Sequence, residues 1–274
     1  GTTPTLTIGD AGAEDTKIVF DGNAQDYYIG LDDSADDLVI GKGSAVGTTP
    51  AIVIDEDLNV GIGTTPATGV RLDMRSDATT NIADLRNANS SGFGLYVAGG
   101  SSSSQYALRA ADKDNNALFS VLSDGSVTKP KQPAFSVTRD ASQSNIAVNS
   151  GAVTVLWQTE IFDQNADFAS NTFTAPVTGR YQLQTSVRIQ DAMTASLYYY
   201  LQLVTSNRAY LGYIINTAGF DQDLNYLTLN ITVLADMDAS DTAFVRIVQH
   251  SGNQQTDIYG GNEYSTNFSG YLVA

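Results

Sequence analysis

The chain of 274 residues contains no cysteine, a single histidine and few basic residues. Without cysteine it can form neither a disulfide framework nor a thiolate metal site, so its stability must come from packing or from association between chains. No apolar stretch reaches the roughly 18 residues that a membrane-spanning helix needs. Because 14 lysines and arginines stand against 30 acids, the formal charge is −16. Such a surface repels phosphate backbones and anionic bilayers, which argues against nucleic acid or membrane insertion.

The residues that usually carry catalysis are also scarce. His250 is the only histidine, and no strained nucleophile turn accompanies it, so we expect no catalytic triad. Acidic pairs such as Asp32-Asp33 lie in turn-like sequence, where solvated carboxylates are the usual outcome. Asp112 begins a stretch with the spacing of a calcium loop, but Ala117 occupies the position where that loop needs glycine. We therefore predict that the chain has no catalytic residues and is not an enzyme.

Glycine, tyrosine and phenylalanine are frequent, and short runs of valine, isoleucine and threonine recur along the chain. This composition is typical of half-buried strands, and no segment has a convincing helical period, so we predict an all-β protein. The length favours two structural units. Residues 129–133, Lys-Pro-Lys-Gln-Pro, form a short stiff joint. We therefore predict a stem of short strands over residues 1–131 and a head over residues 132–274.

The stem is repetitive. The tetrapeptide Gly-Thr-Thr-Pro occurs at residues 1–4, 47–50 and 63–66. The first two copies lead into apolar alternations at residues 5–10 and 51–56, which predict strands of four or five residues. A single chain of such short strands cannot bury both faces and leaves open edges, so we expect three chains to associate. Longer strands are predicted further on, at residues 94–97, 105–109 and 116–122.

A resemblance supports this interpretation of the stem. Residues 57–66, Asp-Leu-Asn-Val-Gly-Ile-Gly-Thr-Thr-Pro, resemble a repeat found in many phage tail fibres and related bacterial surface fibres. The resemblance covers the stem. It implies a fibrous protein that assembles as a homotrimer.

The head carries a second resemblance. The residues from Asp167 to Leu183, which include Phe173, Pro176, Gly179 and Tyr181, resemble the signature of the complement component one q globular head, with Leu183 where that family usually has phenylalanine. Residues 265–273 resemble the closing strand of the same family. The resemblance covers about residues 132–274 and implies an antiparallel jelly roll of the trimeric complement and tumour necrosis factor type.

The residue pattern of the head agrees with that fold. Phe173 and Tyr181 take core-facing strand positions, Pro176 and Gly179 suit the turn between them, and Gly270 permits close strand approach. Further strands are predicted at residues 196–204, 209–215, 224–234 and 243–249, which is the spacing of a sandwich. If each strand reverses direction and the last one ends beside the stem, the loops at residues 190–194, 216–223 and 251–264 lie together at the far end.

These three loops carry carboxylates and aromatic rings, which suit a sugar or a cation, although solvated loop charge is the alternative. The candidate ligand-binding residues are Asp191, Phe220, Asp221, Asp223, Asp257, Tyr259, Asn262, Glu263 and Tyr264. In some members of the resembling family, acids in the matching loop bind calcium. The resemblance therefore implies a calcium site at Asp221 and Asp223, although no cofactor is required.

The strand around residues 197–203 alternates, which places Tyr198 and Tyr200 on the face opposite Leu197, Tyr199, Leu201 and Leu203. One of these faces is core. A tyrosine ring with a hydroxyl suits a surface with one wet end, so we expect the face of Tyr198 and Tyr200 to form a trimer interface or, alternatively, a ligand platform.

Together the two resemblances imply a phage tail fibre on the virion, a homotrimer whose head attaches it to a host-surface glycan or outer-membrane protein. Three alternatives stay open. The first is an extracellular fibre adhesin of a bacterial surface or injection system. The second is a spike that depolymerises polysaccharide, and the third is a stem whose head only drives trimerisation.

Overall fold

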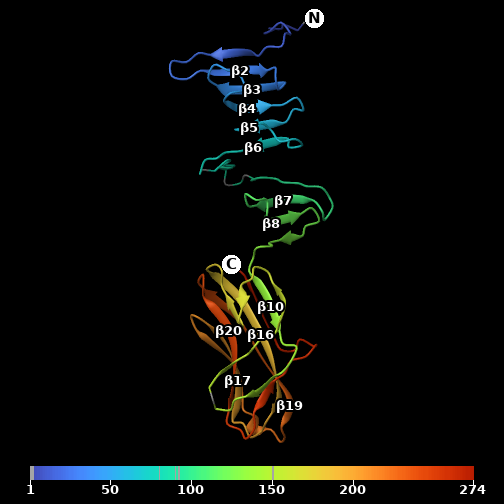
Figure 1. Cartoon of the computed structure of the whole chain (residues 1–274), viewed down its shortest axis with the longest axis vertical. Coiled ribbons are helices and arrows are strands. Elements are labelled where there is room, and N and C mark those ends of the chain that lie inside the picture. Colours follow the sequence, from blue (N-terminus) through green and yellow to red (C-terminus); the bar gives the residue numbers. More distant parts are fainter. Residues whose placement is uncertain (1–2, 80, 90, 92, 150) are drawn as a thin grey trace. The chain divides into compact units, whose positions relative to one another are not determined.

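The computed structural model describes residues 3–79, 81–89, 91, 93–149 and 151–274. These residues form strands and loops with one short 3-10 turn, η1 (Thr217–Gly219), which confirms the predicted all-β class. Within this part of the chain, no helix has the length and apolar character of a membrane span. The chain divides into two compact units, Gly1–Tyr96 and Val97–Ala274 (Figure 1).

The N-terminal unit is a six-stranded sheet whose strands follow the order of the sequence. The five antiparallel strands are β1 (Thr16–Phe20), β2 (Tyr27–Asp32), β3 (Asp37–Lys42), β4 (Pro50–Ile54) and β5 (Val60–Ile62), and β6 (Leu72–Met74) runs parallel to β5. Tyr28, Val39 and Val53 are buried on one face. Glycines on that face let the connecting loops lie against the sheet: a Cβ added at Gly41 would lie 2.8 Å from the Thr49 carbonyl, and one at Gly61 would lie 2.1 Å from the Thr64 carbonyl.

Two strands predicted for the stem are absent among the described residues. Residues 5–10 form no strand, although their sequence parallels that of β4. The difference is one of neighbours, because β4 is paired on both sides by β3 and β5, whereas Leu6 is 83% exposed. Residues 94–97 likewise form no strand. The first copy of the tetrapeptide lies in part outside the described residues.

The second unit opens with a three-stranded sheet of β7 (Tyr106–Ala111), β8 (Ala117–Leu122) and β9 (Val127–Thr128). Asp112 Oδ1 accepts from the backbone N–H groups of Asp114 and Asn116, at 3.0 and 2.8 Å. The stretch that resembles a calcium loop is therefore the turn of the β7–β8 hairpin. The second compact unit thus begins at Val97, before this sheet. The predicted head begins later, at Gln132, two residues before β10 (Ala134–Thr138).

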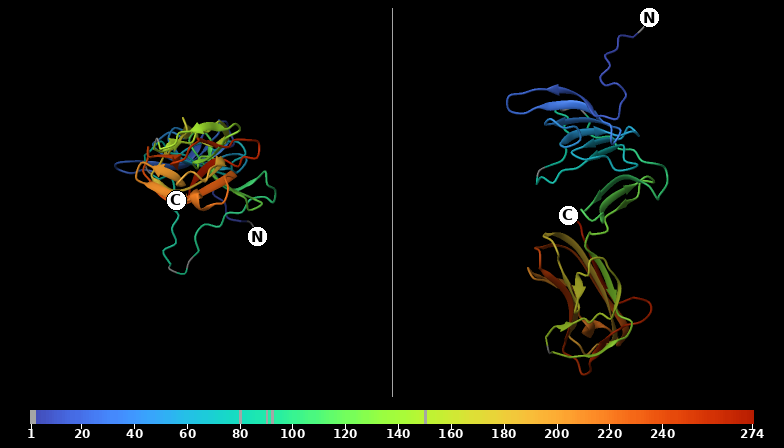
Figure 2. Two further views of the ribbon diagram at one scale, coloured as in Figure 1. Left: turned by 90° about the horizontal axis from the view of Figure 1, so that it is seen from below. Right: turned by 45° about the horizontal axis from the view of Figure 1, so that its top comes forward.

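From β10 onward the strands form two facing antiparallel sheets (Figure 2, right view). The first sheet contains β11 (Gln143–Ile146), β21 (Thr256–Ile258), β16 (Gly179–Ala192), β22 (Asn267–Leu272), β10 and β13 (Thr159–Asp163), with β19 (Leu224–Met237) along the other edge of β16. The second contains β14 (Phe168–Ala169), β15 (Thr172–Thr174), β20 (Thr242–His250), β17 (Tyr198–Thr205) and β18 (Ala209–Ile215), with β12 (Val153–Thr154) beside β20. The chain passes repeatedly between the two sheets, with β16, β19 and β22 in the first and β17, β18 and β20 in the second, which confirms the predicted jelly roll.

The core forms where the sequence predicts it. Phe173 and Tyr181 are fully buried with their rings 5.4 Å apart, and the Tyr181 hydroxyl donates to the Val177 carbonyl at 2.7 Å. A Cβ added at Gly270 would lie 2.5 Å from Leu183 Cδ2 and 2.9 Å from Phe135 Cε1. Glycine therefore lets β22 lie close to these core side chains of β16 and β10, and all three predictions are confirmed.

The ends of the sandwich are defined by its first and last strands. The Leu272 N–H donates to the Pro133 carbonyl at 3.0 Å, so β22 ends beside the start of β10. The predicted placement of the last strand is thus confirmed. The loops that follow β16, β18 and β20 lie at the opposite end, which is the lower end in Figure 1.

Candidate recognition surfaces of the head

The end of the sandwich remote from the C-terminus, here called the tip, consists of residues 191–197, 216–223 and 251–255. Beneath these loops lies a group of polar side chains that are 0% exposed. They are Ser196, Thr217, Gln249 and Thr256. Buried polar groups are costly unless they are hydrogen bonded, so their partners determine how firmly the loops are held.

Gln249, at the end of β20, is the centre of this network. Its amide nitrogen donates to Ser196 Oγ at 3.0 Å and to the Gln254 carbonyl at 2.9 Å, and its amide oxygen accepts from the Thr256 N–H at 3.2 Å. One side chain therefore connects the loop after β16 to the C-terminal end of the loop after β20.

Two hydroxyl groups extend the network: that of Tyr199 holds the loop after β16, and that of Thr217 connects this loop to residues 216–223. The Tyr199 hydroxyl accepts from the Met193 N–H at 3.2 Å and from Ser196 Oγ at 3.0 Å. Thr217, in η1, lies with its hydroxyl 2.8 Å from the Met193 carbonyl and 3.0 Å from the Ser196 carbonyl. All three tip loops are thus connected through buried hydrogen bonds, which limits their freedom to rearrange.

Asp223 joins two of the loops at the surface. Its Oδ1 atom accepts from the Thr194 N–H at 2.6 Å and from Thr194 Oγ1 at 2.8 Å. These hydrogen bonds lower the pKa of Asp223 below its ordinary value, with the backbone bond as the largest cause. Asp223 is therefore ionised at neutral pH and also has a structural role.

The other predicted residues at this end point outward. Phe220 is 42% exposed and follows η1, and Asp221 is exposed beside it. Asp191 is exposed near the end of β16 in a left-handed backbone conformation, with φ of 57°. The tip thus presents a rigid, acidic surface with one aromatic ring, which suits contact with the hydroxyls and apolar faces of a sugar.

The fit of the tip to calcium is poor. Among the described residues, no three acidic or histidine side chains are close enough together to hold a metal ion. One oxygen of Asp223 is already engaged by Thr194, whereas calcium takes six to eight oxygen ligands. A calcium ion at Asp221 and Asp223 would therefore need most of its ligands from water or from another molecule.

Five predicted residues do not lie at the tip, namely Asp257 in β21 and four residues of the segment that follows it, so their predicted placement is wrong. β21 interrupts the predicted loop and pairs with β16, Ile258 opposite Ile189. The chain then runs back along the side of the sheet, and the Tyr259 N–H donates to the Arg188 carbonyl at 2.8 Å. Residues 259–266 form a lateral loop, the red loop that projects from the side of the sandwich in Figure 1. It carries Tyr259, Asn262, Glu263 and Tyr264.

The lateral loop completes a cluster on the outer face of the first sheet. The Arg188 guanidinium lies 5.7 Å from the ring centroids of both Tyr226 and Tyr259, and these rings are 5.3 Å apart at 76°. Glu263 Oε2 is 3.6 Å from Arg188 Nη1. The charge of Glu263 raises the pKa of Tyr259, with desolvation second. Two rings packed edge to face beside a charged pair suit contact with a polar ligand.

Asp257 and the tyrosine face belong to other parts of the head. Asp257 Oδ1 accepts from the Asn145 N–H at 2.7 Å, so this half-buried carboxylate holds the segment of β11. On the second sheet, the Tyr198 ring stacks on Tyr200 at 5.9 Å and on His250 at 4.6 Å. Both tyrosines are half-buried and face away from the core as predicted, but Leu197 is 46% exposed and not in the core.

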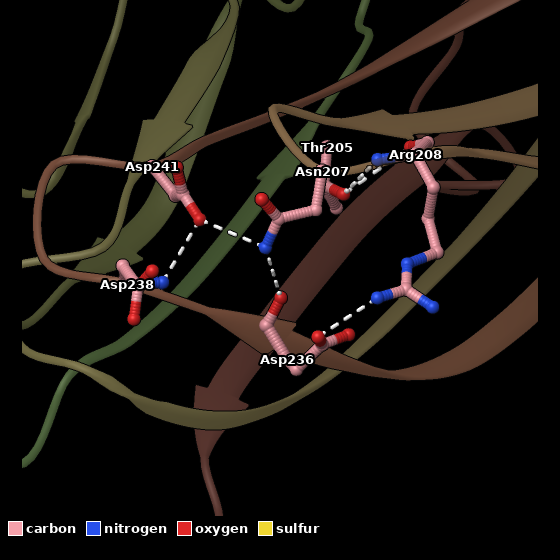
Figure 3. A network of polar contacts seen from close by, with 6 residues as sticks. All are labelled: Thr205, Asn207, Arg208, Asp236, Asp238 and Asp241. Carbon is pink, nitrogen blue, oxygen red and sulfur yellow. Dashed lines mark hydrogen bonds and ion pairs between the residues drawn. The ribbon is translucent and has the colours of Figure 1, made fainter.

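The end of the sandwich that carries the C-terminus is held by a separate polar network (Figure 3). Asn207 Nδ2 donates to the Asp236 carbonyl at 2.9 Å and to Asp241 Oδ2 at 3.1 Å. Arg208 Nη2 donates to Asp236 Oδ2 at 2.8 Å, and the Asp238 N–H donates to Asp241 Oδ2 at 2.8 Å. The acids here serve to join the β17–β18 turn to the β19–β20 connection.

Comparison with known proteins gives structural matches only. No protein-family model and no curated protein sequence matches the chain. The globular domain of zebrafish complement 1qA matches with 17% identity over 53% of this chain and 98% of its own, with a TM-score of 0.38. Murine APRIL matches with 14% identity over 52% of this chain and 100% of its own, with a TM-score of 0.37. The strand order described above, independently of these matches, defines the head as a jelly roll.

Three residues that contact predicted site residues were not themselves predicted from the sequence. Thr194 holds Asp223, and Arg188 and Tyr226 complete the lateral cluster. Arg188 occupies an outward position in an alternating strand, which predicts exposure. Its proximity to Tyr226 depends on the register of β16 with β19, in which Arg188 lies opposite Thr228, and no local pattern encodes that register.

Proposed function

We propose that this chain is part of a homotrimeric attachment fibre, of the kind carried by phage tails, whose head binds a glycan or a protein on a host surface. The tip is the observation that carries the proposal. Its outer surface presents Phe220, Asp221 and Asp191, and its loops are held from beneath by Gln249. A surface that is already ordered loses little conformational entropy on binding, so this construction favours recognition.

The proposed role is ligand binding without catalysis, at the exposed surface of a virion. Three heads on one fibre would act together, because multivalent attachment raises apparent affinity by roughly 10² to 10⁴ without new contacts. The lateral cluster around Arg188 offers a second surface on which a ligand could be held. Variants can separate the two surfaces.

The test uses the labelled 274-residue chain on a glycan array and on intact host cells, with and without calcium. The tip variant carries Phe220→Ala and Asp221→Asn, and the lateral variant carries Arg188→Ala. The control is Glu160→Gln, which removes one exposed charge from β13. We expect the tip variant to lose binding at least tenfold, whereas the control keeps it.

The other outcomes are equally informative. Loss of binding in the Arg188→Ala variant alone would place the ligand at the lateral cluster. Failure of the unmodified chain to bind any candidate host surface would contradict the attachment role. Light scattering tests the homotrimer separately, and a monomeric mass would contradict it.

A further inference from the structure

The strand register of the N-terminal unit aligns apolar side chains in two rows on one face of its sheet. Residues that are paired across neighbouring strands project to the same face. The first row consists of Ile18, Ile29, Ile40, Ile52, Ile62 and Met74, and the second of Leu31, Leu38, Ile54, Val60 and Leu72. We refer to these eleven residues as the aliphatic face.

The aliphatic face is the exposed side of the sheet. The opposite side is buried under the connecting loops, as Tyr28, Val39 and Val53 show with 0 to 2% exposure. In contrast, Ile40 is 37% exposed although its strand, β3, is paired on both sides. Leu38 is 45% exposed and Leu72 is 57% exposed. Monomeric soluble proteins rarely leave contiguous apolar patches larger than a few hundred Å² uncovered, so a face of eleven adjacent apolar side chains indicates a partner.

The charge distribution favours another copy of the same chain as that partner. Every side chain in the two rows is uncharged, whereas the acids near this face occupy strand ends and turns, for example at residues 32–37 and 55–57, and Asp73 in β6 is buried on the opposite face. Contact between copies through the aliphatic face therefore keeps the acidic turns at the periphery. Because the rows repeat at every strand, identical copies present matching rows to one another.

We propose that three copies of this chain pack their aliphatic faces against one another around a threefold axis that crosses the strands. Facing sheets lie about 10 Å apart, so side chains reach about 5 Å from a sheet to the axis. A triangle with that inner radius has sides of about 17 Å, which is the span of a five-residue strand. The strands β1 to β4 have five or six residues each. The proposal rests on the homotrimer proposed above and identifies the surface that forms it.

The absence of cysteine from the chain allows a direct test. A cysteine is introduced into the 274-residue chain as Ile40→Cys in the middle of the aliphatic face. The matched control is Leu58→Cys, at an exposed aliphatic residue in the β4–β5 turn. Each variant is treated at low concentration with a short trivalent maleimide. In the proposed arrangement the three sulfurs introduced by Ile40→Cys come within roughly 10 Å of one another, so we expect covalent trimers from Ile40→Cys and none from Leu58→Cys.

Light scattering on the same samples separates this inference from the proposed function. A trimeric mass with no crosslinking of Ile40→Cys would overturn the assignment of the aliphatic face while leaving the homotrimer intact. Covalent dimers without trimers, together with a dimeric mass, would overturn the threefold arrangement. Equal crosslinking of both variants would mean that the reagent reports collisions, and would also count against the proposal. A monomeric mass would overturn both the inference and the homotrimer.

Discussion

The buried amide of Gln249 predicts that one substitution will loosen the whole tip. In Gln249→Ala the side chain loses its donors to Ser196 and Gln254 and its acceptor for the Thr256 N–H. Three hydrogen bonds at about 1 kcal/mol each disappear, and the buried Thr256 N–H left without its partner adds about 1 kcal/mol or more. We therefore expect the free energy of unfolding of the head to fall by roughly 3 to 5 kcal/mol.

Urea unfolding followed by tryptophan fluorescence measures this loss. Trp157 is the only tryptophan and its ring lies 6.0 Å from the buried Phe268, so its emission reports the head alone. The matched control is Gln255→Ala, at an exposed glutamine in the same loop, and we expect it to change stability by less than about 0.5 kcal/mol. A loss below about 1 kcal/mol in Gln249→Ala would refute the conclusion that the network holds the tip.

Gln249→Glu separates lost hydrogen bonds from lost volume, because the two side chains have nearly the same shape. A glutamate could still accept from the Thr256 N–H but, when ionised, could not donate to Ser196 or Gln254. Burial would raise its pKa in the folded state above its value in the unfolded state, which is about 4.3. The folded state then binds the proton more tightly, so the loss of stability relative to the unmodified chain should be smallest below about pH 4 and should grow as the pH rises through the raised pKa.

Three further predictions concern the other surfaces. Hydrogen bonds from Thr194 lower the pKa of Asp223, so the stability that Asp223 contributes is complete above about pH 4 and is lost as the pH falls through the lowered pKa. In acid unfolding, Asp223→Asn should therefore lose less stability over that pH range than the unmodified chain. Glu263→Gln should lower the pKa of Tyr259, since the Glu263 charge is the largest cause of its rise; an unchanged phenol titration would contradict the lateral contact. Ile40→Lys should weaken association of the stem at least tenfold in sedimentation, whereas the same change at Leu58 should not.

Local alternation was sufficient to predict the long strands of the head. The predicted strand at residues 209–215 coincides with β18, and Phe173 and Tyr181 are buried as expected. The lateral loop could not be predicted, because β21 has only three residues. A strand that short carries no recognisable period, yet its pairing with β16 determines that Tyr259 and Glu263 lie at the side of the head and not at the tip.

In the stem, too, local sequence was not sufficient to predict which segments form strands. Residues 5–10 and 51–54 share an apolar alternation, but only the second segment is a strand, because it has neighbours on both sides. Strand formation depends on pairing as much as on the residues themselves. Sequence also indicated that one chain could not cover both faces of the stem sheet, but which face stays exposed follows from the position of the covering loops against Gly41 and Gly61.

The tip and the aliphatic face have complementary roles in the proposed function. The tip offers a few exposed side chains, such as Phe220 and Asp221, and contacts of that kind favour modest affinity for a single ligand. Association through the aliphatic face would place three tips on one fibre and convert the second and third binding events into intramolecular ones, which raises avidity without any new contact at the tip. The exposed aliphatic face, which would be a liability in a monomer, would therefore serve the proposed multivalent attachment.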